Sequence, residues 1–118
     1  MQGTLLVGWG AIIPGREKQA AQVLGEAMGY LTALKCEGRL DGMDAVLLEP
    51  HGGELEGFVL LRGDAAQLAA LRAEPAFVRT IVAVQLVHAK VRVVAAFEGA
   101  AMQSLMGIWD EQEDRLLG

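Results

Sequence analysis

The fold is decided by residues 40–62, which read LDGMDAVLLEPHGGELEGFVLLR. Two short apolar segments, 44–49 and 55–62, are separated by the polar, glycine-containing residues 50–54. Apolar runs of this length, bounded by proline and glycine, are typical of strands, and the residues between them have the composition of a hairpin loop. We therefore expect two neighbouring antiparallel strands in the middle of the chain.

Upstream of this hairpin, the pattern predicts a strand and then a helix. Residues 4–13, TLLVGWGAII, are mostly aliphatic and end at Pro14, which indicates a strand that is apolar on both faces. The helix begins after Gly15 and ends at Gly38, a residue suited to a helix C-terminus. Apolar residues recur along it at spacings of three and four: Ala20, Leu24, Ala27, Met28, Leu31 and Leu34.

Downstream of the hairpin, two helical pieces, a strand and a last helix are predicted. Asp64 is a suitable N-cap for the first piece, and Pro75 fits the first turn of the second. Residues 90–98 alternate as a strand does, and a helix follows Gly99. This last helix carries an apolar stripe and then an acidic run: Met102, Leu105, Met106 and Trp109, followed by residues 110–114.

The order of the first six elements, βαββαβ, is that of the ferredoxin-like fold, an α+β fold with two helices on one face of a four-stranded antiparallel sheet. We expect residues 1–118 to form one such domain with an added C-terminal helix, since no linker or repeat interrupts the chain. The helices of this fold leave one sheet face open, and its strands here are apolar on both faces. A second subunit buries two open faces at once, so we expect a homodimer rather than a folded-back C-terminal helix.

Composition excludes several classes of protein. The 118 residues are 53% hydrophobic, which excludes intrinsic disorder, and the formal net charge of −5 argues against binding to nucleic acid or to anionic membranes. The single cysteine, Cys36, forms no internal disulfide. The apolar stretch near the N-terminus is far shorter than the roughly 20 residues of a membrane span and has its positive charges on the wrong side for a signal peptide. We expect a cytoplasmic protein.

Four stretches carry a resemblance to a known family: GREKQA at 15–20, LLEPHGG at 47–53, GFVLLRGD at 57–64 and LAALR at 68–72. The chain resembles an uncharacterised bacterial family of the dimeric α/β-barrel superfamily, in which two ferredoxin-like subunits pack sheet against sheet. The superfamily includes cofactor-independent monooxygenases, muconolactone isomerases, haem-degrading enzymes and stress-response proteins. No catalytic motif is common to them, so the resemblance implies a fold and an assembly, without an activity.

Motifs for the common chemistries are weak. The only serine, Ser104, lies within a helix, without the strained turn that a nucleophile needs. Cys36 lies at a helix C-terminus, which does not activate a thiol. No glycine-rich phosphate loop is present, and the histidines have no second His or Cys nearby, so we expect no metal and no cofactor.

His51 is the candidate acid/base residue. It lies in a glycine-flanked loop, and an imidazole exchanges protons near neutral pH. The alternative is that His51 only stabilises the turn; for His88, which precedes the last strand, a structural role is favoured. Four further residues are candidates for ligand binding, either as walls or as charged rims of the barrel: Trp9, Glu49, Phe58 and Arg62.

Two hypotheses follow. In the first, the protein binds a small hydrophobic ligand in the barrel, without catalysis, or recruits a partner through its last helix. In the second, it is a monooxygenase- or isomerase-like enzyme that works without a cofactor, with His51 as acid/base and Arg62 paired with a substrate anion. The position of Trp9 stays open, because strand alternation does not say which face is the barrel interior.

Overall fold

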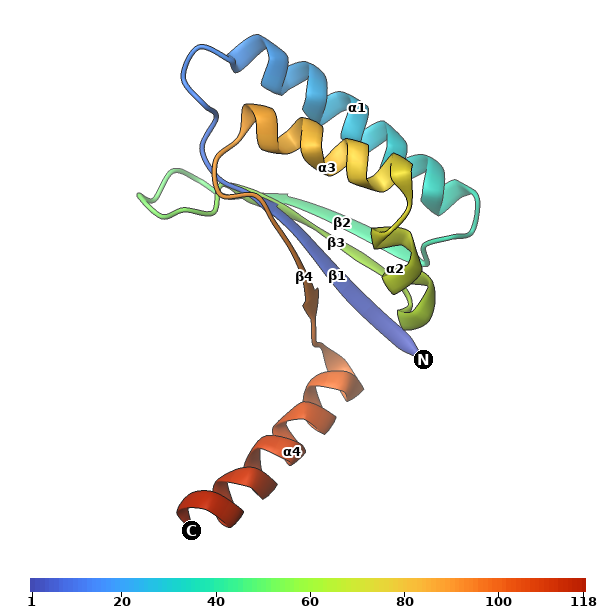
Figure 1. Cartoon of the computed structure of the whole chain (residues 1–118), viewed down its shortest axis with the longest axis vertical. Coiled ribbons are helices and arrows are strands. Elements are labelled where there is room, and N and C mark those ends of the chain that lie inside the picture. Colours follow the sequence, from blue (N-terminus) through green and yellow to red (C-terminus); the bar gives the residue numbers. More distant parts are fainter.

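A computed structural model describes all residues, 1–118. Its four strands form one antiparallel sheet in the order β2-β3-β1-β4, and α1 and α3 lie side by side on one face of that sheet (Figure 1). This is the predicted ferredoxin-like arrangement. The elements are β1 (Gln2–Trp9), α1 (Glu17–Cys36), β2 (Gly42–Leu47), β3 (Gly57–Asp64), α2 (Ala65–Arg72), α3 (Pro75–Val87), β4 (Arg92–Ala96) and α4 (Gly99–Leu117).

The first strand ends earlier than the sequence predicts. β1 stops at Trp9, and the predicted continuation to Ile13 leaves the sheet, with Ile12 making an isolated bridge to His88. Beyond Trp9 the chain stays close to the segment before β4, and the Gly10 N–H donates to the Ala89 carbonyl at 2.7 Å. A Cβ at this position would lie 2.7 Å from the same oxygen. Only glycine, which has no Cβ, therefore allows the two segments to come this close.

The core lies between the sheet and the helices. Leu5, Val7 and Trp9 point from β1 toward the helices and are buried, as the shared parity predicts. Val59 and Leu61 of β3, their neighbours in register, are 0% exposed. The helices complete the core with residues of the predicted stripes, including Ala27, Leu31, Leu34, Phe77 and Val84. Each of the large side chains contributes roughly 1.5–3 kcal/mol by its burial.

The opposite face of the sheet is open. One row across the four strands consists of Asp44, Leu60, Leu6 and Val94, which are partners in register. Leu6 and Leu60 are only partly buried, and Val94 is 47% exposed. No helix covers this row, in which Leu6, Leu60 and Val94 are apolar, as the sequence predicts, and Asp44 is charged.

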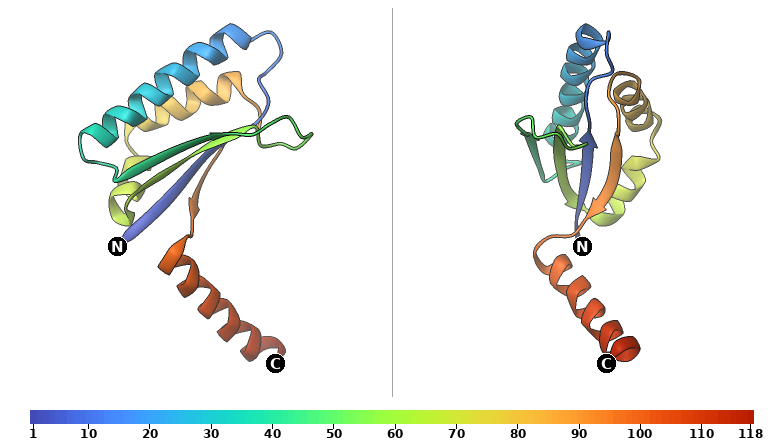
Figure 2. Two further views of the ribbon diagram at one scale, coloured as in Figure 1. Left: turned by 180° about the vertical axis from the view of Figure 1, so that it is seen from behind. Right: turned by 90° about the vertical axis from the view of Figure 1, so that its left-hand side faces the viewer.

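α4 stands apart from the rest of the chain. It leaves the end of β4 and projects away from the sheet on the side opposite α1 and α3 (Figure 2). None of its residues is buried, and the predicted stripe is exposed, with Trp109 at 66%. The radius of gyration, 16.4 Å, exceeds the value of about 13 Å typical of a compact chain of this length. None of the helices combines the length and the apolar character that crossing a bilayer requires.

Candidate functional site

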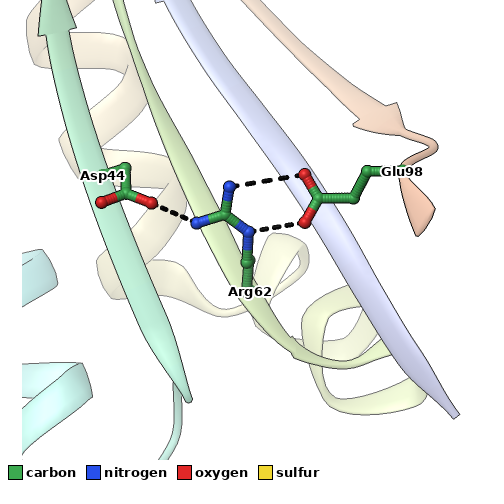
Figure 3. Close-up of polar contacts among 3 residues, drawn as sticks. All are labelled: Asp44, Arg62 and Glu98. Atoms are coloured by element: carbon green, nitrogen blue, oxygen red, sulfur yellow. Dashed lines mark hydrogen bonds and ion pairs between the residues drawn. The ribbon is translucent and has the colours of Figure 1, made fainter.

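Arg62 lies on the open face of the sheet and is held by two carboxylates (Figure 3). Its Nε donates to Glu98 Oε1 at 2.6 Å, and its Nη1 donates to Asp44 of the neighbouring strand. The hydrogen bonds to Glu98 and Asp44 raise the pKa of Arg62, and the bond from Arg62 lowers the pKa of Glu98. The guanidinium is therefore already paired with two carboxylates of its own subunit.

His51 and Glu49 lie at the other end of the hairpin from Arg62. Arg62 pairs in register with Gly42 at the start of β2, whereas His51 follows the end of that strand. His51 Nδ1 lies 3.0 Å from the carbonyl oxygen of Glu49, and both side chains are exposed. This geometry is that of a turn-stabilising histidine. The structure does not bring His51, Glu49 and Arg62 together.

Trp9 and Phe58 lie on opposite faces of the sheet. Phe58 shares the open face with Leu60, while Trp9 faces the helices and is 5% exposed. The indole lies over Gly57, its partner in register, where a Cβ would come 2.8 Å from Cζ2. Trp9 therefore does not line the space between two sheets; it forms a wall of the interior beneath the helices.

A small cavity adjoins Trp9 between the sheet and the helices α1 and α3. Its volume is about 20 Å³, which is room for about one water molecule. Its walls come from β1, β3, α1 and α3, and all of its lining residues are hydrophobic except Thr80 and His88. The Thr80 hydroxyl donates to the Ala76 carbonyl of its own helix at 2.9 Å. His88 is thus the one titratable side chain at this apolar cavity.

The orientation of His88 is fixed by the backbone opposite it. Its Nδ1 lies 2.9 Å from the carbonyl oxygen of Gly10, which is only an acceptor, so Nδ1 carries the proton. In the neutral ring Nε2 then has the free lone pair. The ring centroid lies 6.2 Å from that of Trp9, with the planes at 55°. His88 is half-buried in this position and borders the cavity.

The sequence favours a structural role for His88, because this residue precedes the last strand in an apolar context. Its position between a helix and the last strand is the signal in the sequence that could have identified it as a site residue. In the ferredoxin-like fold this connection lies beside the end of the first strand. No group of three or more His, Cys, Asp or Glu residues is arranged to hold a metal ion.

Comparison with solved structures identifies the same fold. The chain resembles a dimeric ferredoxin-like protein of unknown function from Jannaschia sp. CCS1 (TM-score 0.64, 20% identity, covering 83% of this chain and 100% of that one). It also resembles a DABB family protein with a ferredoxin-like fold from Mesorhizobium loti (TM-score 0.64, 9% identity, 85% and 100% covered). A third is SnoaB, a cofactor-independent oxygenase from Streptomyces nogalater (TM-score 0.51, 13% identity, 84% and 96% covered).

These similarities show that the chain has the ferredoxin-like fold. Sequence identities this low establish the fold alone. No protein-family model matches the chain. No curated protein matches it either.

Proposed function

We propose that this chain works as a homodimer that binds a small apolar molecule with one hydroxyl group in the cavity beneath its helices. The observation that carries the proposal is His88, whose Nδ1 is bonded to Gly10 and whose ring borders a cavity lined otherwise by hydrophobic residues and Thr80. Pockets for small molecules combine apolar walls with a few fixed polar groups in this way. The ligand then lies beneath the helices rather than in the barrel between two sheets that the sequence suggested, because Trp9 faces the helices and His51 is exposed and bonded to its own loop.

The homodimer is supported by the open sheet face. Leu6, Phe58 and Leu60 lie there half-buried beside Val94, and no element of the chain covers them. A contiguous apolar face of this kind is typical of an interface. The Jannaschia protein of the same fold is described as dimeric.

The size of the cavity limits the ligand. A cavity on the order of 150 Å³ holds benzene, and this cavity has only a fraction of that volume. The α1 residues Leu24 and Met28 line the cavity and are half-buried, and methionine adapts readily to irregular space. We therefore expect a ligand of one aromatic ring, admitted by movement of these side chains between α1 and α3.

His88 also supports a second candidate function, acid–base catalysis without a cofactor. A neutral imidazole with its Nδ1 proton donated to a carbonyl is oriented to accept a proton at Nε2. A bound phenol or enol would transfer its hydroxyl proton to Nε2, leaving its oxygen anionic and an imidazolium stabilised by the Gly10 carbonyl. SnoaB, which shares the fold, is a cofactor-independent oxygenase. In this candidate His88 takes the role that the sequence suggested for His51.

Titration by NMR tests the binding proposal directly, because the chain has two tryptophans. Trp9 borders the cavity and Trp109 lies exposed on α4, so the indole N–H signal of Trp109 serves as the internal reference. We expect phenol to shift the Trp9 signal and to bind roughly three- to tenfold more tightly than toluene, the effect of one hydrogen bond.

The matched variants are His88→Phe and His51→Ala. His88→Phe is expected to remove the preference for phenol while retaining toluene, and His51→Ala is expected to change neither. If phenol leaves the Trp9 signal unmoved, or if His88→Phe retains the full preference, the proposal is wrong. Chemical-shift dispersion in the same spectra reports whether each variant is folded.

A further inference from the structure

A groove follows the seam between α1 and α3, which lie side by side over the sheet (Figure 1). Two hollows lie along this seam, one of about 200 Å³ and one of about 450 Å³, and both have Val23 of α1 and Ala83 of α3 among their walls. Glu26 and Arg79 line the smaller hollow from the two helices without forming an ion pair with each other. The surface of the seam is therefore hollowed rather than filled by side chains.

The smaller hollow and the cavity beneath the helices share part of their walls. Val23, Ala27 and Thr80 line both spaces. Val23 and Thr80 are half-buried, and Ala27 is buried. None of these side chains is larger than valine, so the wall between the hollow and the cavity is thin at this place.

The opposite wall of the cavity is the sheet, and it is closed. Val7 of β1 and Val59 of β3 form part of this wall and are partners in register. Val59 is 0% exposed, and the two strands pair without a break along their whole length. A molecule would have to break backbone hydrogen bonds to pass here. A route into the cavity therefore passes the helices.

The seam is held by polar contacts at its two ends and by none between them. Before α1, Arg16 donates to the carbonyl of Leu86, near the end of α3, at 2.5 Å. After α1, Arg39 forms an ion pair with Glu74, which directly precedes α3. No hydrogen bond or ion pair joins α1 itself to α3 itself. The middle of the seam can thus open without breaking a polar contact while its ends stay fixed.

We propose that small molecules enter the cavity through the middle of this seam, between Val23 and Ala27 on α1 and Thr80 on α3. Val23 is the gate residue, because it borders the cavity and both hollows. The proposal rests on the ligand site proposed above and names the way into it. Opening requires only that apolar side chains of the two helices separate.

Quenching of Trp9 fluorescence by acrylamide tests this route without a ligand. Trp9 lines the cavity, and the only other tryptophan, Trp109, is exposed on α4 and is replaced in every sample by Trp109→Phe. Val23→Ala removes two methyl groups from the gate. We expect it to raise the rate constant for quenching of Trp9 roughly threefold, because less packed apolar surface has to separate. Val23→Leu, which enlarges the same side chain, is expected to lower this rate constant.

Val59→Ala and Leu24→Ala are the matched controls, because both residues line the cavity and neither lines a hollow. Each is expected to change the quenching of Trp9 less than Val23→Ala does, and circular dichroism reports whether each variant is folded. An unchanged rate constant in Val23→Ala would overturn the route. An equal increase in Val59→Ala would also overturn it, because access would then follow lost stability. A larger increase in Leu24→Ala would overturn it by placing the entrance elsewhere along α1.

The route and the ligand fail separately. If Val23→Ala speeds the quenching as expected but phenol leaves the Trp9 NMR signal unmoved, the route into the cavity stands and the binding proposal is wrong. If phenol binds but the quenching does not respond to Val23, the binding proposal stands and the route is wrong.

Discussion

The side of the sheet that faces α1 and α3 carries Val59 and Leu61, both 0% exposed, whereas the opposite side carries Val94, which is 47% exposed, and no helix. Both sides carry aliphatic residues from the same four strands, although the open side also carries Asp44 and Arg62. The difference therefore comes from what covers them, and it means that hydrophobicity alone does not identify the core of one subunit. One side is completed within the chain, and we propose that a second copy of the chain completes the other.

The largest expected effect of this difference is on the free energy of unfolding of variants at two neighbouring leucines of β3. Leu61 points toward the helices and Leu60 toward the open face. Leu61→Ala is expected to lower the free energy of unfolding by about 2–5 kcal/mol at every protein concentration, because it leaves a cavity in a closed core. Leu60→Ala is expected to lower the free energy of unfolding less than Leu61→Ala does at low protein concentration. Its effect is expected to grow at high concentration, where dimers form.

Urea unfolding monitored by circular dichroism over a hundredfold range of protein concentration separates the two variants. If both variants lose the same free energy of unfolding at the lowest concentration, the two sides of the sheet do not differ within a subunit. That result would contradict the proposed difference between the two sides.

A smaller effect is expected from the charges on the open face. The hydrogen bond from Arg62 holds the pKa of Glu98 below its ordinary value of 4.5, so Glu98 contributes stability above that pH. This contribution is lost as the pH falls through the lowered pKa of the folded state. Glu98→Gln is therefore expected to reduce the melting temperature at pH 7 and to differ progressively less from the wild type below about pH 4.

The matched control for this prediction is Glu113→Gln, which removes an exposed α4 carboxylate that makes no ion pair. It is expected to change the melting temperature less than Glu98→Gln does at pH 7. A Glu98→Gln variant as stable as the wild type at pH 7 would mean that the ion pair adds nothing on this exposed face.

Local signals in the sequence account for the predicted element order. Asp64 caps α2 by accepting from the Gln67 N–H at 3.2 Å, and Pro75 begins α3, as their residue types predict. Element ends were less predictable where a distant segment decides them. β1 ends at Trp9, with one isolated bridge beyond it, from Ile12 to His88, and β4 covers only Arg92–Ala96 of the predicted 90–98.

The candidate site was harder to predict than the fold, for the same reason. Alternation along β1 placed Leu5, Val7 and Trp9 on one face but did not say which face the helices would cover. His88 owes its fixed ring to the Gly10 carbonyl, 78 residues away, and Arg62 owes its pairing to Asp44 and Glu98 on other segments. Contacts this distant leave no periodic signal in a single sequence.

Sedimentation velocity at micromolar concentration tests the central claim, that a second copy covers the open face. The wild type is expected to sediment as a dimer of the 12.6 kDa chain, and Leu60→Glu, which places a charge in the middle of that face, is expected to sediment as a folded monomer. A wild type that remains a stable monomer of 12.6 kDa, or a Leu60→Glu variant that dimerises as tightly as the wild type, would contradict the account.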